Sequence, residues 1–176
     1  MLNKSTRLSS TKRLTYLAMF IALSAAGANI KIPSIIGTPA FDSLPAFIAG
    51  LVLGPVNGAI VAALGHLLTA STAGFPLSIP IHLLIAVGMA VVVAVFALVS
   101  RLTIWGGAVV GILMNGILFP AVFILIPSFG KPFFLAMVIP LLVASVLNIV
   151  LAEIVFQPLS RMLSATYVKV RKGAAA

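Results

Sequence analysis

The chain has 176 residues, of which 62% are hydrophobic and only 7% are charged. A soluble domain of this size cannot bury so much apolar surface, and apolar runs of about twenty residues are long enough for a helix to cross a bilayer. The net charge of +9 comes from basic residues beside apolar runs, which is typical of membrane proteins and argues against nucleic-acid binding. Because the chain has no cysteine, disulfides, cysteine nucleophiles and thiolate metal sites are excluded.

Six apolar segments follow one another along the chain, with Gly and Pro at the breaks between them. They lie at about residues 14–30, 40–53, 56–73, 79–100, 104–127 and 133–160. The runs do not alternate apolar and polar residues, as barrel strands do, so we predict an all-α membrane protein with six transmembrane helices. The second segment is short and has Pro45 in its first turns, so it could be partly extended or re-entrant. We expect a basic segment at 1–13, a six-helix membrane domain at 14–165 and a basic tail at 166–176.

Basic residues predict the orientation of the chain, because loops on the cytoplasmic side are enriched in Lys and Arg. If both termini are cytoplasmic, only Lys31 and Lys131 of the 11 basic residues lie outside. The others then lie inside: Lys4, Arg7, Lys12, Arg13, Arg101, Arg161, Lys169, Arg171 and Lys172. An alternative is that the first segment is a secretory signal, since it has a basic start, an apolar middle and a small-residue end. Its removal leaves five spans.

Polar residues in apolar spans are candidates for function, because hydrocarbon is a costly environment for them. In the six-span arrangement, several of these residues fall in the outer half of the membrane. The polar candidates are Lys31, Asp42, His66, His82, Asn115 and Asn148, of which the two asparagines lie nearer the middle, and the aromatic Phe75 lies beside them at the outer face. Glu153 lies near the inner interface, where we interpret it as an interfacial or partner contact.

Two of these candidate groups also have a structural interpretation. Asp42 precedes Leu44 and Pro45 and could cap the following helix, or it could bind a ligand. His66 and His82 could hydrogen-bond neighbouring helices or bind a ligand. Neither histidine belongs to a metal-binding motif, and we expect no metal site and no cofactor.

Small residues form a stripe on the first segment, where Ala18, Ala22 and Ala26 recur every four residues. Such a stripe allows another helix to approach closely, either within this chain or from a separate protein. The sequence contains neither a nucleophile elbow nor a nucleotide-binding loop, so it is not expected to be an enzyme or to hydrolyse ATP.

The chain resembles the substrate-binding S components of energy-coupling factor (ECF) vitamin transporters. The alanine stripe is similar to the alanine motif of this family, "IKIPSIIGTPAFDSLPAF" to its first outer loop and second span, and "GHLLTASTAGFPLSIPIHLLIA" to its third and fourth spans. The resemblance implies that the outer loops cover a vitamin pocket. It also implies that the first span docks, through Ala18, Ala22 and Ala26, on a transmembrane coupling subunit that works with two ATPase subunits.

By this resemblance the chain is a multi-pass protein of the bacterial plasma membrane that topples in the membrane to release its vitamin inside. The quoted segments most closely resemble those of members that bind cobalamin or its precursor α-ribazole. Pantothenate is the alternative substrate. Phe41, Phe75 and Phe119 could stack on a flat ring, while His66, His82, Asn115 and Asn148 could hydrogen-bond it. Lys31 or Lys131 could pair with the carboxylate of pantothenate. A stand-alone carrier or channel and an intramembrane enzyme using His66, His82 and Asp42 remain further alternatives.

Overall fold

The computed structural model describes residues 9–31 and 40–173, and for residues 162–173 it describes the helical backbone alone. Apart from an isolated bridge between Lys31 and Ala40, the described residues form helices and turns without strands. The α-helices are α1 (Ser10–Gly27), α2 (Leu44–Leu53), α3 (Pro55–Thr72), α4 (Ile79–Val99), α5 (Ile104–Leu113), α6 (Phe119–Ala121) and α7 (Gly130–Gly173). A π-helix, η1 (Met114–Leu118), and a 3-10 helix, η2 (Val122–Leu125), interrupt the fifth predicted segment.

Three stretches of the described chain are long and apolar enough to cross a membrane, by length and composition. These are Ile79–Val99, Ile104–Leu125 and Gly130–Arg161, and Leu44–Leu53 is a shorter apolar helix. These helices confirm the prediction of an all-helical membrane protein. Since α1 and α3 are also helical, every predicted segment contains a helix, but the count of six spans remains a prediction.

Proline and glycine set the helix boundaries near the positions predicted from the sequence. Pro45, Pro55 and Pro80 each lie in the first turn of a helix, where the missing amide hydrogen costs nothing. Gly54 has a φ of 93°, a left-handed conformation that favours glycine, and it allows α2 to turn directly into α3. At α1, the Ser9 hydroxyl accepts a hydrogen bond from the Lys12 amide at 3.4 Å.

Close helix packing depends on small residues at the contacts. Gly58 of α3 lies against Gly50 of α2 with no space for a side chain, and Gly65 of α3 lies against Ser24 of α1. In the core of the bundle, the fully buried rings of Phe47 and Phe96 meet edge to face, with their centroids 5.0 Å apart. These contacts join α1, α2, α3 and α4 into one bundle.

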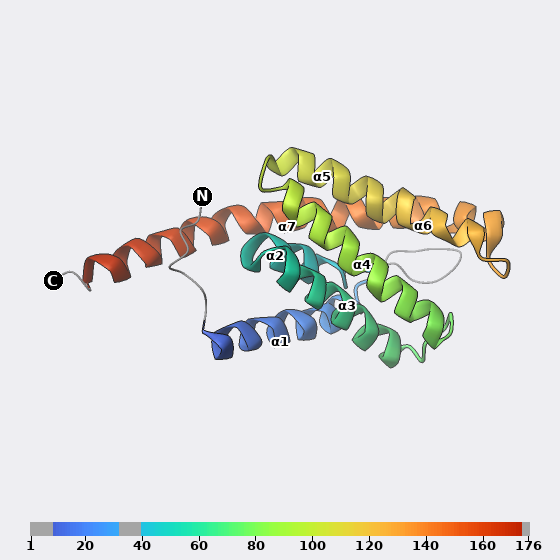
Figure 1. Ribbon diagram of the computed structural model, residues 1–176, viewed down its shortest axis with the longest axis horizontal. Coiled ribbons are helices and arrows are strands. Elements are labelled where there is room, and N and C mark those ends of the chain that lie inside the picture. The colour runs from blue at the N-terminus through green and yellow to red at the C-terminus, as the bar shows by residue number, and fades with distance from the viewer. Residues whose placement is uncertain (1–8, 32–39, 174–176) are drawn as a thin grey trace.

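The two ends of the bundle differ in charge and in loop structure. The start of α1, the α2–α3 turn, the α4–α5 turn and the end of α7 lie toward one end (Figure 1). There the Arg13 Nε donates to the Asn57 Oδ1 at 2.8 Å, and the Arg101 guanidinium lies beside Gly54. The loop between α3 and α4 and the turn before α7 lie toward the other end (Figure 1), which we call the loop end. The start of α1 and the end of α7 therefore lie toward the same end of the molecule.

The break between α5 and α7 has a local cause. Pro120 has no amide hydrogen to donate into the preceding turn, and the chain forms a π-helix there before continuing as α6 and η2. At Gly116 the π-helix lies against the backbone of Leu142 on α7, so no side chain fits at this position. A π-helix turns the following side chains to a new face, and such turns are frequent at functional sites.

Candidate functional site

A cavity of about 520 Å³ opens at the loop end of the bundle. Its size falls within the range of about 300–1,000 Å³ that is usual for small-molecule sites. It is lined by the end of α1, the turn before α2, the α3–α4 loop and the helices α3, α4, η1, α6, η2 and α7. The polar lining residues are Asn29, Lys31, Asp42, Ser43, His66, Thr69, Thr72, His82 and Asn115, and the aromatic ones are Phe119, Phe123 and Phe133.

Two histidines on neighbouring helices form a hydrogen-bonded pair in the wall of this cavity. The Nε2 atom of His66 on α3 and the Nδ1 atom of His82 on α4 are 3.1 Å apart. Because a hydrogen bond between two imidazoles needs one nitrogen as acceptor, the two rings cannot both be fully protonated in this arrangement. His82 is buried, while His66 is half-buried and reaches the cavity.

The loop between α3 and α4 covers the cavity and contacts the histidine pair. Phe75 and Ser78 have positive φ values of 52° and 82°, which are strained for residues other than glycine. The Leu77 amide donates to the His82 Nε2 at 3.4 Å, and the Phe75 ring packs edge-on against the His82 ring at 5.7 Å. His82 therefore holds this loop in a strained conformation above the cavity.

Asp42 lies in the turn before α2, outside the helix. Helix α2 starts at Leu44 with Ser43 as its N-cap residue, so the capping interpretation of Asp42 is wrong. Burial raises the pKa of the Asp42 carboxyl to about 6, although hydrogen bonds from the backbone amides of Asp42 and Ser43 and from Thr69 oppose this shift. The Thr69 hydroxyl lies 3.5 Å from the Asp42 Oδ2. The carboxyl group lines the cavity and has no cationic partner among the described residues.

Asn115 lies in the π-helix η1 and lines the cavity. Its side-chain amide donates to the Ser145 hydroxyl on α7 at 2.9 Å, and this hydroxyl donates to the Leu141 carbonyl oxygen at 2.6 Å. These bonds fix the Asn115 side chain at the cavity wall, where its carbonyl oxygen is available as an acceptor. The ring of Phe119, one turn later, lies over Gly88 of α4 and also lines the cavity.

Asn148 lies behind the cavity lining. It is fully buried, and its side-chain amide donates to the carbonyl oxygens of Ala40 at 3.1 Å and Ala144 at 2.8 Å. The first of these bonds ties α7 to the segment that leads into Asp42. The second tie in this segment is the backbone pairing of Lys31 with Ala40, supported by a bond from the Phe41 amide to the Ile30 carbonyl oxygen at 3.2 Å. The structure thus places Asn148 as a support for the Asp42 turn.

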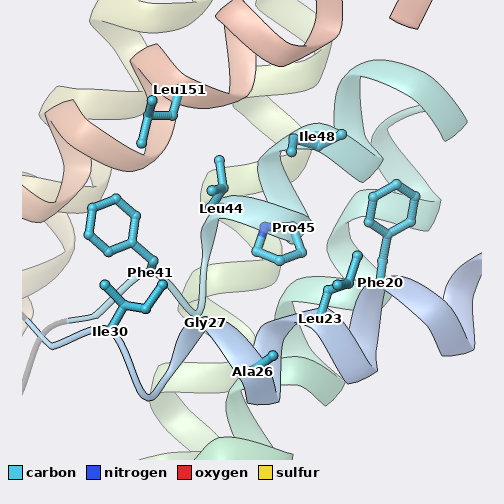
Figure 2. Close-up of a pocket in the computed structure, with 10 residues that line it drawn as sticks. All are labelled: Phe20, Leu23, Ala26, Gly27, Ile30, Phe41, Leu44, Pro45, Ile48 and Leu151. Atoms are coloured by element: carbon cyan, nitrogen blue, oxygen red, sulfur yellow. The ribbon is translucent and has the colours of Figure 1, made fainter.

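Phe41 faces a separate apolar groove of about 460 Å³ rather than the polar cavity. Figure 2 shows its ring between Ile30 and Leu151, with Leu44 beside it and Ala26 on the neighbouring helix. The adjacent residues Phe41 and Asp42 therefore line different sites: Phe41 lines the apolar groove, and Asp42 lines the polar cavity. Of the prolines in the preceding loop, Pro33 and Pro39 lie outside the described residues.

The remaining predicted residues fall into two groups. Ala18, Ala22 and Ala26 are all exposed on one face of α1, while Leu17, Phe20 and Ser24 face the bundle. Glu153 is buried on α7, and its Oε1 atom has no hydrogen-bond partner among the described residues. Lys31 and Lys131 are exposed.

The comparisons with known proteins agree with this geometry. A family model described as "ECF transporter, substrate-specific component" matches residues 12–160. The chain belongs to this family. As a substrate-specific ECF component, it is a substrate-binding membrane subunit rather than an enzyme, and it associates with other ECF transporter subunits.

A solved structure shows the same fold. The one described as "Structure and mechanism of the S component of a bacterial ECF transporter" has a TM-score of 0.61 and 21% sequence identity to this ECF component. The alignment covers 90% of this chain and 99% of that chain. No curated protein sequence matches the chain.

Sequence reasoning missed several residues of the cavity. Thr69 lies three positions after His66 and so shares its helix face, a spacing that could have identified it. Phe123 and Phe133 stack with ring centroids 5.2 Å apart and form an aromatic wall. No sequence pattern predicts this pairing, because it depends on how the turn after η2 brings η2 and α7 against each other.

Proposed function

We propose that this ECF component captures a small vitamin or vitamin precursor in the polar cavity at the loop end. The observation that carries this proposal is the arrangement of Asp42, His66, His82 and Asn115 around one cavity with an aromatic wall. A few polar groups in a largely apolar site are typical of small-molecule recognition. The strained loop at Phe75 and Ser78 supplies the cover that the resemblance implies.

We further propose that the exposed alanine face of α1 docks on the transmembrane coupling subunit. Ala18, Ala22 and Ala26 contribute no bulky side chains, so a partner helix can approach their backbone closely. In the proposed cycle, two separate ATPase subunits hydrolyse ATP, and this component topples in the membrane to release its substrate inside. The six-span arrangement in a bacterial plasma membrane, with both termini cytoplasmic, belongs to the same proposal.

The substrates that we favour are α-ribazole and cobalamin, with pantothenate as the alternative. The aromatic wall suits a flat ring, and the histidines and Asn115 suit its polar substituents. Pantothenate is supported only by Lys31, whose side chain is exposed at the cavity lining.

The direct test is mass spectrometry of the small molecule that co-purifies with the protein. We expect one compound at near-equal molar ratio, and uptake of that compound by cells only when the coupling and ATPase subunits are present. Uptake by the purified chain alone in liposomes would indicate a stand-alone carrier instead.

A further inference from the structure

We propose that the cavity selects a compact, uncharged, hydroxylated nitrogen heterocycle, with Asp42 accepting from its hydroxyl or amino groups and His66 donating to a ring or sugar acceptor. This inference rests on the proposed function of the cavity and narrows its substrate class. It separates the three candidate substrates, which differ strongly in size and charge.

Size is the first argument. The cavity volume of about 520 Å³ lies in the lower half of the range for sites that bind drug-sized molecules, which is about 300–1,000 Å³. A compound of the size of a benzimidazole riboside is small enough for this volume. An intact corrinoid is much larger than this volume, so the size of the cavity favours the smaller compound.

Charge is the second argument. Asp42 contributes a carboxyl group to the lining, and among the described lining residues Lys31 is the one cationic side chain. Lys31 is exposed, whereas Arg13 and Arg101 lie at the opposite end of the bundle, beside Asn57 and Gly54. An anionic ligand would meet the Asp42 carboxylate in a partly dry site without a buried cation to compensate. The lining therefore disfavours a carboxylate or phosphate ligand.

Hydrogen bonding around the histidine pair defines which group His66 offers to the ligand. The Leu77 amide donates to the His82 Nε2, so in neutral His82 the proton is on Nδ1. That proton is donated to the His66 Nε2 at 3.1 Å, which leaves the His66 proton on its own Nδ1. His66 thus presents a donor to the cavity, and its acceptor is already used by His82.

Asp42 provides the complementary acceptors. One carboxylate oxygen receives the Thr69 hydroxyl at 3.5 Å, a long contact that leaves acceptor capacity on the carboxylate. A carboxylate can accept two donors side by side, as it does from the vicinal hydroxyls of a ribose. The site then has a donor at His66, acceptors at Asp42 and Asn115, and a stacking surface at Phe123 and Phe133.

The experiment is titration calorimetry of the purified full-length protein with α-ribazole, pantothenate and cobalamin as probes. We expect α-ribazole to bind at least about 100-fold more tightly than the other two. Asp42→Asn should weaken α-ribazole binding by roughly 5- to 150-fold, as expected for the loss of a charged acceptor in a partly dry cavity. Glu153→Gln is the matched control, because it also converts a buried acid to its amide and should leave binding unchanged.

A pair of substitutions tests the role of His66. Glutamine places its amide near the Nε2 position and can keep the bond to His82 while losing the Nδ1 donor. Asparagine places its amide near the Nδ1 position and keeps that donor. We therefore expect His66→Gln to weaken α-ribazole binding more than His66→Asn, with thermal unfolding used to show that both variants are folded.

The results separate this inference from the proposed function. Binding of pantothenate or cobalamin as tight as that of α-ribazole, or a co-purified ligand that is anionic or much larger than a nucleoside, overturns the inference and leaves the transport role intact. Wild-type binding by Asp42→Asn also overturns it. Failure of the purified protein to bind any small molecule overturns both this inference and the proposed function.

Discussion

At the residue scale, His82 connects the polar cavity with its covering loop. One ring nitrogen accepts from the Leu77 amide, the other lies 3.1 Å from His66, and the Phe75 ring packs against its edge. The positive φ angles of Phe75 and Ser78 are maintained only while such contacts hold the loop. His82 thus supports both the donor in the cavity and the loop above it.

We predict that His82→Ala and Phe75→Ala each weaken substrate binding. Losing one buried hydrogen-bond or ring partner costs about 1–3 kcal/mol, so the affinity should fall roughly 5- to 150-fold. Calorimetry with the co-purified ligand measures the effect, and Glu153→Gln is again the control. Wild-type affinity in both alanine variants would place the substrate elsewhere.

A second residue-scale prediction concerns pH. Burial raises the pKa of Asp42 to about 6, so the carboxyl is ionised above this pH and neutral below it. If the ionised form accepts the donors of the ligand, affinity should rise from pH 5 to pH 8 by up to about tenfold per pH unit below the pKa. His66, His82 and Lys31 line the same cavity, so Asp42→Asn is needed to isolate the contribution of the carboxyl. A pH profile that is unchanged in this variant contradicts the prediction.

At the element scale, α1 has one face packed on the bundle and one left open. Leu17, Phe20 and Ser24 are buried against its neighbours, and Ser24 meets Gly65 of α3. The alanine face points away from these contacts. The sequence allowed this stripe to pack either within the chain or against another protein, and among the described residues no helix of this chain covers it. Ala26 also borders the apolar groove that holds Phe41 (Figure 2).

We predict that Ala22→Trp abolishes uptake in cells but leaves substrate binding by the isolated protein unchanged. The bulky side chain has space on the exposed face of the isolated chain, but it would prevent the close approach of a partner helix. Vitamin uptake assays and calorimetry on the same variant make the comparison. A parallel loss of binding and uptake would show that the stripe is needed for the fold instead.

At the scale of the whole molecule, Arg13 and Arg101 lie at the end opposite the polar cavity. The start of α1, which carries Arg13, and the α4–α5 turn, which carries Arg101, lie toward one end (Figure 1). The cavity is lined by Lys31 and by residues of the α3–α4 loop, at the loop end. This separation is what the positive-inside rule produces if the cavity opens to the outside. In the orientation that we propose, the cavity would receive its substrate from the external medium.

We predict that residues 31 and 131 are accessible from outside the cell and residue 101 is not. The natural chain has no cysteine, so single cysteines at these positions give unambiguous labelling. On intact cells, an impermeant thiol reagent should modify the variants at 31 and 131, and modify the variant at 101 only after permeabilisation. Labelling at 101 but not at 31 would reverse the orientation.

The apolar segments of the sequence and the Gly and Pro residues between them were sufficient to predict where the long helices lie. The predicted segments at 56–73 and 79–100 agree within about one residue with α3 and α4, because Pro55, Gly74 and Pro76 are strong local signals. The family resemblance likewise agrees with the family match. The π-helix at Met114–Leu118 was not predicted, because it depends on how Pro120 and Gly116 fit against α7 as well as on local preference.

The sequence alone determined the apolar spans, the basic residues at their ends and the set of polar residues available for a site, since these follow from composition and spacing. Only the tertiary structure decided which of those residues meet. It joined His66 to His82, turned Phe41 and Asp42 to different surfaces, and placed Asn148 behind the lining, bonded to Ala40. The reason is that the direction of a side chain depends on helix rotation and crossing, which small contacts such as Gly50–Gly58 and Gly65–Ser24 fix between segments distant in sequence.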